Sequence, residues 1–113
     1  MTLAFDTTRD AFLGGKLTLS QPAHGYRAGV DAVMLAASCE ARTGARVLEL
    51  GAGTGAVLCC LGYRRPDLDL TGVERNPTYA DLAALNLKSN GLNGKVLTAD
   101  FTARLFGDNP RFD

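Results

Sequence analysis

The chain has 113 residues, of which 46% are hydrophobic, so it can bury the core of one small domain and is too apolar for intrinsic disorder. Its 12 basic residues balance its 12 acidic residues, so bulk charge gives no indication of a polyanionic partner, although a local basic patch stays open. No apolar run is long enough to span a membrane, and Cys39, Cys59 and Cys60 lack the spacing of metal ligands or of a disulfide framework. We therefore expect a cytoplasmic protein with reduced thiols, no metal and no membrane contact.

The N-terminal part of the chain predicts a leader, a strand and a helix. Residues 1–11 are polar and mixed, and we expect a loose leader before a domain that spans residues 12–113. Leu17 and Leu19 alternate with polar residues, which predicts a short half-buried strand or hairpin. Almost every residue over 30–41 is apolar or small, which predicts a mostly buried helix.

Strand and helix patterns alternate from residue 46 onward. The predicted strands are RVLEL (46–50), DLTGVE (69–74) and KVLTAD (95–100), and the predicted helices are AVLCCLGYRR (56–65) and NPTYADLAALNLKSN (76–90). This order predicts an α/β fold, a partial doubly wound (Rossmann-like) parallel sheet with right-handed crossovers. A three-stranded parallel sheet leaves a bare strand edge, so we expect the chain to be truncated before a fourth strand.

A glycine-rich turn follows the first strand of this sheet. The stretch GAGTG places glycines at 51, 53 and 55, directly after Glu49 and Leu50. Such a turn lets a ligand approach the backbone, and it also fits the loose dinucleotide pattern. A carboxylate at position 49 would repel a pyrophosphate, whereas S-adenosylmethionine carries an ammonium, a sulfonium and no phosphate. Glu74 is placed to accept the ribose hydroxyls of either ligand, and Asp100 to contact an adenine amine.

Three of these stretches carry a family resemblance. VLELGAGTG, GVERNP and TADF resemble the first three cofactor motifs of the Rossmann-like, S-adenosylmethionine-dependent methyltransferases. The preceding segment, FLGGKLTLSQPAHGYRAGVDAVMLAA, is similar to the bacterial tRNA (valine) adenine amino-methyltransferases, a group close to other amino methyltransferases of nucleic acids and proteins. The resemblance runs from roughly residue 10 to the end of the chain. It implies S-adenosyl-L-methionine as cofactor and tRNA as substrate, methylated on the exocyclic amine of an adenine.

The resemblance also implies a set of cofactor-binding residues, which makes this chain the cofactor-binding half of a methyltransferase domain. Arg27 would meet the methionine carboxylate, and Arg75 and Phe101 would flank the adenine and ribose. The full set is Tyr26, Arg27, Gly29, Glu49, Gly51, Ala52, Gly53, Gly55, Glu74, Arg75, Asp100 and Phe101.

One family motif is missing from the sequence. The Asn-Pro-Pro-Tyr tetrapeptide that accepts hydrogen bonds from the target amine does not occur, and DNPRF (108–112) reads as a loop. We therefore assign no catalytic residue and expect the chain alone to bind cofactor weakly or not at all and not to turn over. Two alternatives stay open: a nicotinamide (NAD)-dependent oxidoreductase, and a non-catalytic fragment that self-associates through its bare sheet edge.

Overall fold

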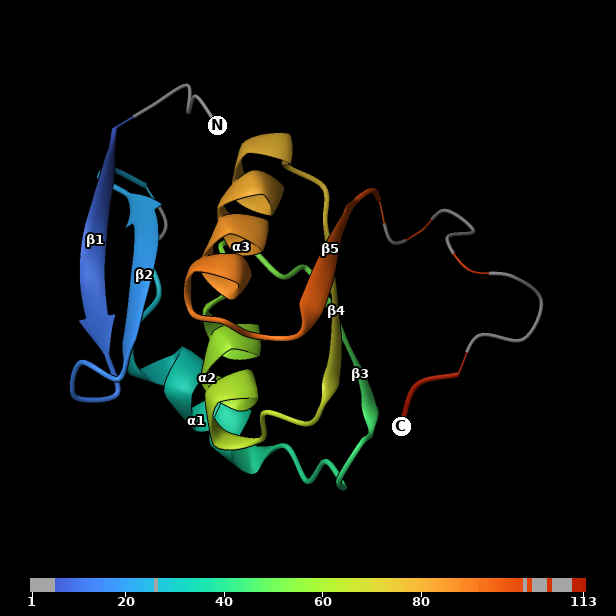
Figure 1. The fold of residues 1–113 in the computed structure, drawn as a ribbon. Helices are drawn as coiled ribbons and strands as arrows, with labels where there is room; N and C mark the ends of the chain where they lie inside the picture. The colour runs from blue at the N-terminus through green and yellow to red at the C-terminus, as the bar shows by residue number, and fades with distance from the viewer. Residues whose placement is uncertain (1–5, 26, 101, 103–105, 107–110) are drawn as a thin grey trace.

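The computed structural model describes residues 6–25, 27–100, 102, 106 and 111–113 (Figure 1). Its elements are β1 (Thr7–Phe12), β2 (Leu17–Pro22), α1 (Val30–Ser38), β3 (Arg46–Leu50), α2 (Ala56–Arg64), β4 (Asp69–Glu74), α3 (Pro77–Ser89) and β5 (Gly94–Thr98). β1 and β2 form an antiparallel hairpin, and β3, β4 and β5 form a parallel sheet with β4 in the centre. The predicted α/β fold with a partial doubly wound parallel sheet is confirmed.

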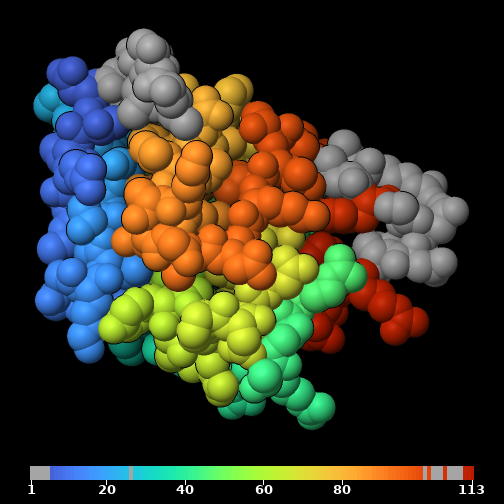
Figure 2. Space-filling model, viewed as in Figure 1, coloured from blue at the N-terminus to red at the C-terminus, as the bar shows by residue number. Residues whose placement is uncertain are grey.

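The described elements form three layers. In Figure 1 the hairpin lies on one side of α2 and α3, and the parallel sheet lies on their other side. The space-filling view shows the hairpin directly against α3 (Figure 2). Leucines from four elements fill the space between the layers and are almost fully buried: Leu17, Leu19, Leu58, Leu61, Leu70, Leu82 and Leu87. This packing fixes the hairpin and the sheet relative to the two helices that separate them.

The loose leader expected over residues 1–11 is wrong from residue 7 onward, because residues 7–12 form β1. The strand pairs with β2 from Thr7 opposite Pro22 to Phe12 opposite Leu17. Its residues alternate between exposed and half-buried, and none of them is fully buried. β1 is therefore held by backbone hydrogen bonds, polar contacts and the packing of Phe12 against the core, and a search for apolar periodicity does not detect it.

Helix α1 is shorter and more exposed than the sequence predicts. It ends at Ser38 rather than at residue 41, and only Ala32 and Ala36 are fully buried. Met34 and Leu35 are more than half exposed, at 65% and 57%. The buried alanines face α2, and the larger apolar side chains lie on the opposite side of the helix, so continuous apolar composition overestimated burial here.

β3 lies at an edge of the parallel sheet, and the last residues of the chain lie beside its start. The Asp113 N–H donates to the Arg46 carbonyl at 2.7 Å, and the Arg46 N–H donates to the Asp113 carboxylate at 2.7 Å. The Arg46 guanidinium stacks over the Phe112 ring at 5.2 Å. The loop predicted over 108–112 falls mostly outside the described residues.

Candidate functional site

The glycine turn connects β3 to α2 and requires glycine for conformational reasons. Gly51, Gly53 and Gly55 have φ values of 73°, 58° and 86°, in the left-handed region that side chains disfavour. At Gly55 a Cβ atom would also lie 3.1 Å from the Cα of Ala83 on α3. The turn is therefore both tightly wound and packed closely against α3.

The first backbone N–H groups of this turn donate to β4 and not toward a ligand. Gly51 and Ala52 both donate to the Val73 carbonyl, at 2.8 and 3.0 Å. Gly53 donates to the Glu74 carboxylate at 2.8 Å. A pyrophosphate bound at a glycine turn needs N–H groups that are free to donate to it, and these three N–H groups are already occupied. The geometry of this turn therefore disfavours a dinucleotide.

Two adjoining hollows open around the turn, at the carboxyl ends of the parallel strands. The first has a volume of about 310 Å³ and is lined by residues of the turn and by Ala28, Ala32, Glu49, Thr54, Val57, Glu74 and Tyr79. The second, of about 380 Å³, is lined by Gly51, Val73, Glu74, Arg75, Asp100 and Thr102. Because both share Gly51 and Glu74, they form one cleft where open α/β sheets bind ligands.

Glu49 is the most perturbed acid of the cleft. Its Oε1 atom is buried and has no hydrogen-bond partner among the described residues. Burial, and then the nearby negative charge of Glu74, raises the pKa of Glu49 to about 7. A buried carboxyl oxygen without a partner costs stability, and acids perturbed in this way are typical of functional sites. An ammonium placed beside it would satisfy the oxygen and offset the repulsion between the two acids.

The other two acids of the cleft are oriented by backbone groups. Glu74 accepts hydrogen bonds from the N–H groups of Gly53 and Asn76, one on each carboxylate oxygen. Asp100 accepts from the N–H and the hydroxyl of Thr102, which together with Arg75 hold the pKa of Asp100 below its usual value. Both carboxylates are thus fixed acceptors at the ends of β4 and β5.

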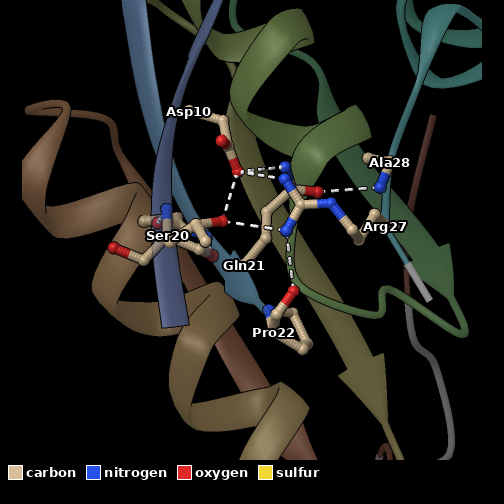
Figure 3. A network of polar contacts seen from close by, with 8 residues as sticks. Asp10, Ser20, Gln21, Pro22, Arg27 and Ala28 are labelled. Atoms are coloured by element: carbon tan, nitrogen blue, oxygen red, sulfur yellow. Dashed lines mark hydrogen bonds and ion pairs between the residues drawn. The ribbon is translucent and has the colours of Figure 1, made fainter. Parts of the chain in front are cut away.

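A polar network on the hairpin holds one wall of the cleft (Figure 3). The Arg27 guanidinium lies 2.8 Å from the Asp10 carboxylate, and it also donates to the Thr8 hydroxyl and the Pro22 carbonyl. The buried Gln21 donates to Asp10 at 2.9 Å and accepts from the Ala28 N–H at 2.7 Å. Hydrogen bonds from Thr8 and Gln21, with the Arg27 charge, lower the pKa of Asp10. The network fixes the segment that carries Ala28 into the cleft.

The structure brings most of the predicted site residues together. Eight members of the predicted set contribute to the cleft or to the turn beside it: Glu49, Gly51, Ala52, Gly53, Gly55, Glu74, Arg75 and Asp100. Arg27 and Gly29 do not line it, since Arg27 binds the hairpin and Gly29 precedes α1. Tyr26 and Phe101 lie outside the described residues. In this arrangement Arg27 orients the backbone beside the cleft. Its contact with the methionine carboxylate of the cofactor stays a prediction.

Sequence reasoning missed three polar residues that shape the cleft. Gln21 and Asn86 are almost fully buried, and Thr54 lies inside the glycine turn. The only signal available was their polarity within apolar stretches, because their partners are distant in sequence. The described part of the chain holds no cluster of acidic, histidine or cysteine residues suited to a metal ion. Nor does it include a helix long and apolar enough to cross a membrane.

The sequence matches the family model described as methyltransferase small domain, over residues 27–112. The chain belongs to this family. The members of the methyltransferase small-domain family are S-adenosylmethionine-dependent methyltransferases. The membership contradicts the oxidoreductase alternative and agrees with the geometry of the turn.

Two relatives and one solved structure illustrate the family relationship. A tRNA1(Val) (adenine(37)-N6)-methyltransferase of Flavobacteriaceae bacterium (strain 3519-10) is 31% identical over 98 residues, which are 87% of this chain and 42% of the relative. The release factor glutamine methyltransferase of Escherichia coli (strain K12) is 36% identical over 63 residues, 55% of this chain and 23% of that enzyme. The crystal structure of M. jannaschii TYW2 in complex with AdoMet superposes with a TM-score of 0.69 and 18% identity, over 88% of this chain and 46% of that one. The chain thus spans less than half the length of these relatives.

Proposed function

We propose that this chain forms the cofactor-binding half of an enzyme that transfers a methyl group from S-adenosylmethionine to an amine. The observation that carries the proposal is the pair of acids Glu49 and Glu74 in one cleft. The first N–H groups of the glycine turn beside them already donate to residues of β4. Such a cleft attracts a cationic amino acid tail and repels a diphosphate. When bound, S-adenosylmethionine supplies an electrophilic methyl group on a sulfonium.

We assign each acid of the cleft to one part of the cofactor. Glu49 binds the ammonium of the methionine tail, because its buried Oε1 has no other partner among the described residues. Glu74 accepts the ribose hydroxyls with a carboxylate that two backbone N–H groups already orient. Asp100 and Arg75 border the adenine in the second hollow. The small side chains of Ala28 and Ala32 leave room for the tail beside the turn.

The methyl acceptor we propose is the exocyclic amine of an adenine in tRNA. Support comes from the tRNA methyltransferase relative, whose similarity covers 87% of this chain, against 55% for the release factor methyltransferase. The wider match takes in the hairpin segment as well as the cofactor motifs. Because Asn-Pro-Pro-Tyr is absent from the 113 residues, the chain alone is expected not to turn over.

Two measurements test the proposal. Calorimetric titration of the chain with S-adenosylmethionine and with NAD should give at most weak binding, and only for the first, and binding of NAD alone would overturn the cofactor assignment. Incubation with methyl-labelled S-adenosylmethionine and bulk tRNA should give no label above background. Transfer by the chain alone would contradict the expected inactivity.

A further inference from the structure

Asn86 on α3 is a fully buried carboxamide whose hydrogen bonds are all made to backbone groups outside its own helix. Its Oδ1 accepts from the Ser20 N–H at 2.8 Å, and its Nδ2 donates to the Ser20 carbonyl at 2.9 Å. The second N–H of the same group donates to the Thr54 carbonyl at 2.9 Å. One side chain thus connects β2 of the hairpin to the glycine turn.

Asn90 repeats the first half of this arrangement one helical turn later. Its Oδ1 accepts from the Thr18 N–H at 3.1 Å, and its Nδ2 donates to the Thr18 carbonyl at 2.9 Å. Four residues of helix rise about 6 Å and two residues of strand about 6.8 Å, so the two spacings match. The two asparagines therefore pair with β2 as a neighbouring strand would. The remaining N–H of Asn90 donates to the Asn86 carbonyl and does not reach the turn.

Asn86 alone extends this pairing to the cleft. Thr54 lies between Gly53 and Gly55, is 3% exposed and lines the first hollow. The neighbouring residues of the turn have other partners. The Gly53 N–H donates to the Glu74 carboxylate, and Gly55 packs closely against α3. Among the described residues, the contact from Asn86 is the side-chain hydrogen bond that connects the turn to the hairpin.

We propose that Asn86 is a positioning residue of the cofactor cleft, which holds the glycine turn in its ligand-ready geometry by joining the Thr54 carbonyl to β2. The identity of the ligand, S-adenosylmethionine, rests on the proposed function. The connection of the glycine turn to β2 through Asn86 rests on the described contacts alone. Removing the carboxamide leaves the Thr54 carbonyl without this donor, so the turn can move relative to α3 and the two acids. Asn90 stabilises the same hairpin and has no part in holding the turn.

The test compares Asn86→Ala with Asn90→Ala, because both remove an amide pair with β2 and only the first releases the turn. Urea unfolding measures the global loss of stability in each variant. Hydrogen exchange of the Gly51, Ala52, Gly53 and Gly55 amides then measures local opening of the turn relative to that loss. In Asn86→Ala the free energy of opening the turn should be well below the free energy of global unfolding. The same variant should bind S-adenosylhomocysteine about tenfold more weakly. Asn90→Ala should keep the turn protected and change the dissociation constant by less than about twofold.

A second variant covers the case in which Asn86→Ala does not fold. Asn86→Asp keeps the side-chain volume and the acceptor for the Ser20 N–H, and it removes both donors. Equal turn protection and equal affinity in the Asn86 and Asn90 variants would overturn the inference. If the unchanged chain binds NAD and not S-adenosylhomocysteine while the Asn86 variants still open the turn, the proposed function fails and the positioning role stands.

Discussion

Replacing Glu49 by glutamine tests whether the buried carboxyl of the cleft binds a cation. The carboxamide keeps the shape of the side chain and cannot become negative. In the unchanged protein only the ionised form of Glu49 attracts an ammonium, so binding of S-adenosylhomocysteine must release a proton whenever Glu49 is protonated beforehand. Its pKa of about 7 puts this exchange in an accessible pH range.

The expected size of the effect follows from the ionised fraction. With a pKa of about 7, half of the Glu49 carboxyls are ionised at pH 7. About one-tenth are ionised at pH 6 and about one-hundredth at pH 5, and the apparent dissociation constant rises as the competent fraction falls. Binding should therefore weaken about fivefold from pH 7 to pH 6 and about tenfold more by pH 5. Glu49→Gln should bind more weakly at pH 7 and show no such slope.

Isothermal titration calorimetry measures this effect between pH 5 and pH 7, where the α-amine of the ligand stays protonated because its ordinary pKa is about 8. Repeating the titration in buffers of different ionisation enthalpy counts the protons released. The cationic-tail assignment is refuted if the affinity of the unchanged protein is flat over this range. The same refutation follows if Glu49→Gln keeps the same slope.

The ligand-free protein supplies an independent check. Because folding raises the pKa of Glu49 from 4.5 to about 7, the folded state binds more protons than the unfolded state between these values. The resulting stability is fully present below about pH 4.5 and is lost as pH rises toward 7. The full difference corresponds to about 3 kcal/mol as an upper bound. Urea midpoints should show that Glu49→Gln lacks this loss.

Three further outcomes can be measured, two with single substitutions and one with the unchanged chain. Gly55→Ala should destabilise the fold by about 1–3 kcal/mol in urea unfolding. Gly44→Ala, which has a similar positive φ and open space around its Cβ, should cost less, and equal costs would contradict close packing of the turn on α3. Arg27→Gln and Asp10→Asn should each weaken S-adenosylhomocysteine binding by about twofold to fivefold, because both release the same cleft wall. Tighter or unchanged binding in Asp10→Asn would instead favour a direct contact between Arg27 and the ligand carboxylate. Size-exclusion chromatography with mass detection at low concentration tests the remaining alternative, and a monomer would speak against pairing through the β3 edge.

The sequence predicted the parallel sheet and its helices because each element carries a strong local signal. Apolar residues mark β3 and β4, and α3 begins at an N-cap, the Asn76 side chain, which accepts from the N–H groups of Thr78 and Tyr79. The acids of the cleft were also predictable, because each lies at or just after the carboxyl end of a strand and parallel strands end at one edge of a sheet.

The parts that escaped prediction depend on partners distant in sequence. β1 has one large apolar residue, Phe12, and no apolar alternation, so its pairing with β2 decides that it is a strand. Gln21 and Asn86 are ordinary polar residues until the fold buries them against backbone groups. The burial of α1 depends on which side faces α2, and continuous apolar composition carries no information about that choice.

The asparagine pairing of β2 also constrains how the chain acquires its structure during synthesis. Thr18 and Ser20 find their partners 72 and 66 residues later, on α3. The hairpin leaves the ribosome before α3 and therefore presents an open strand edge until α3 has been made. The hairpin is thus translated well before the helix that holds it in place, which leaves an interval in which a chaperone or another nascent chain can occupy that edge.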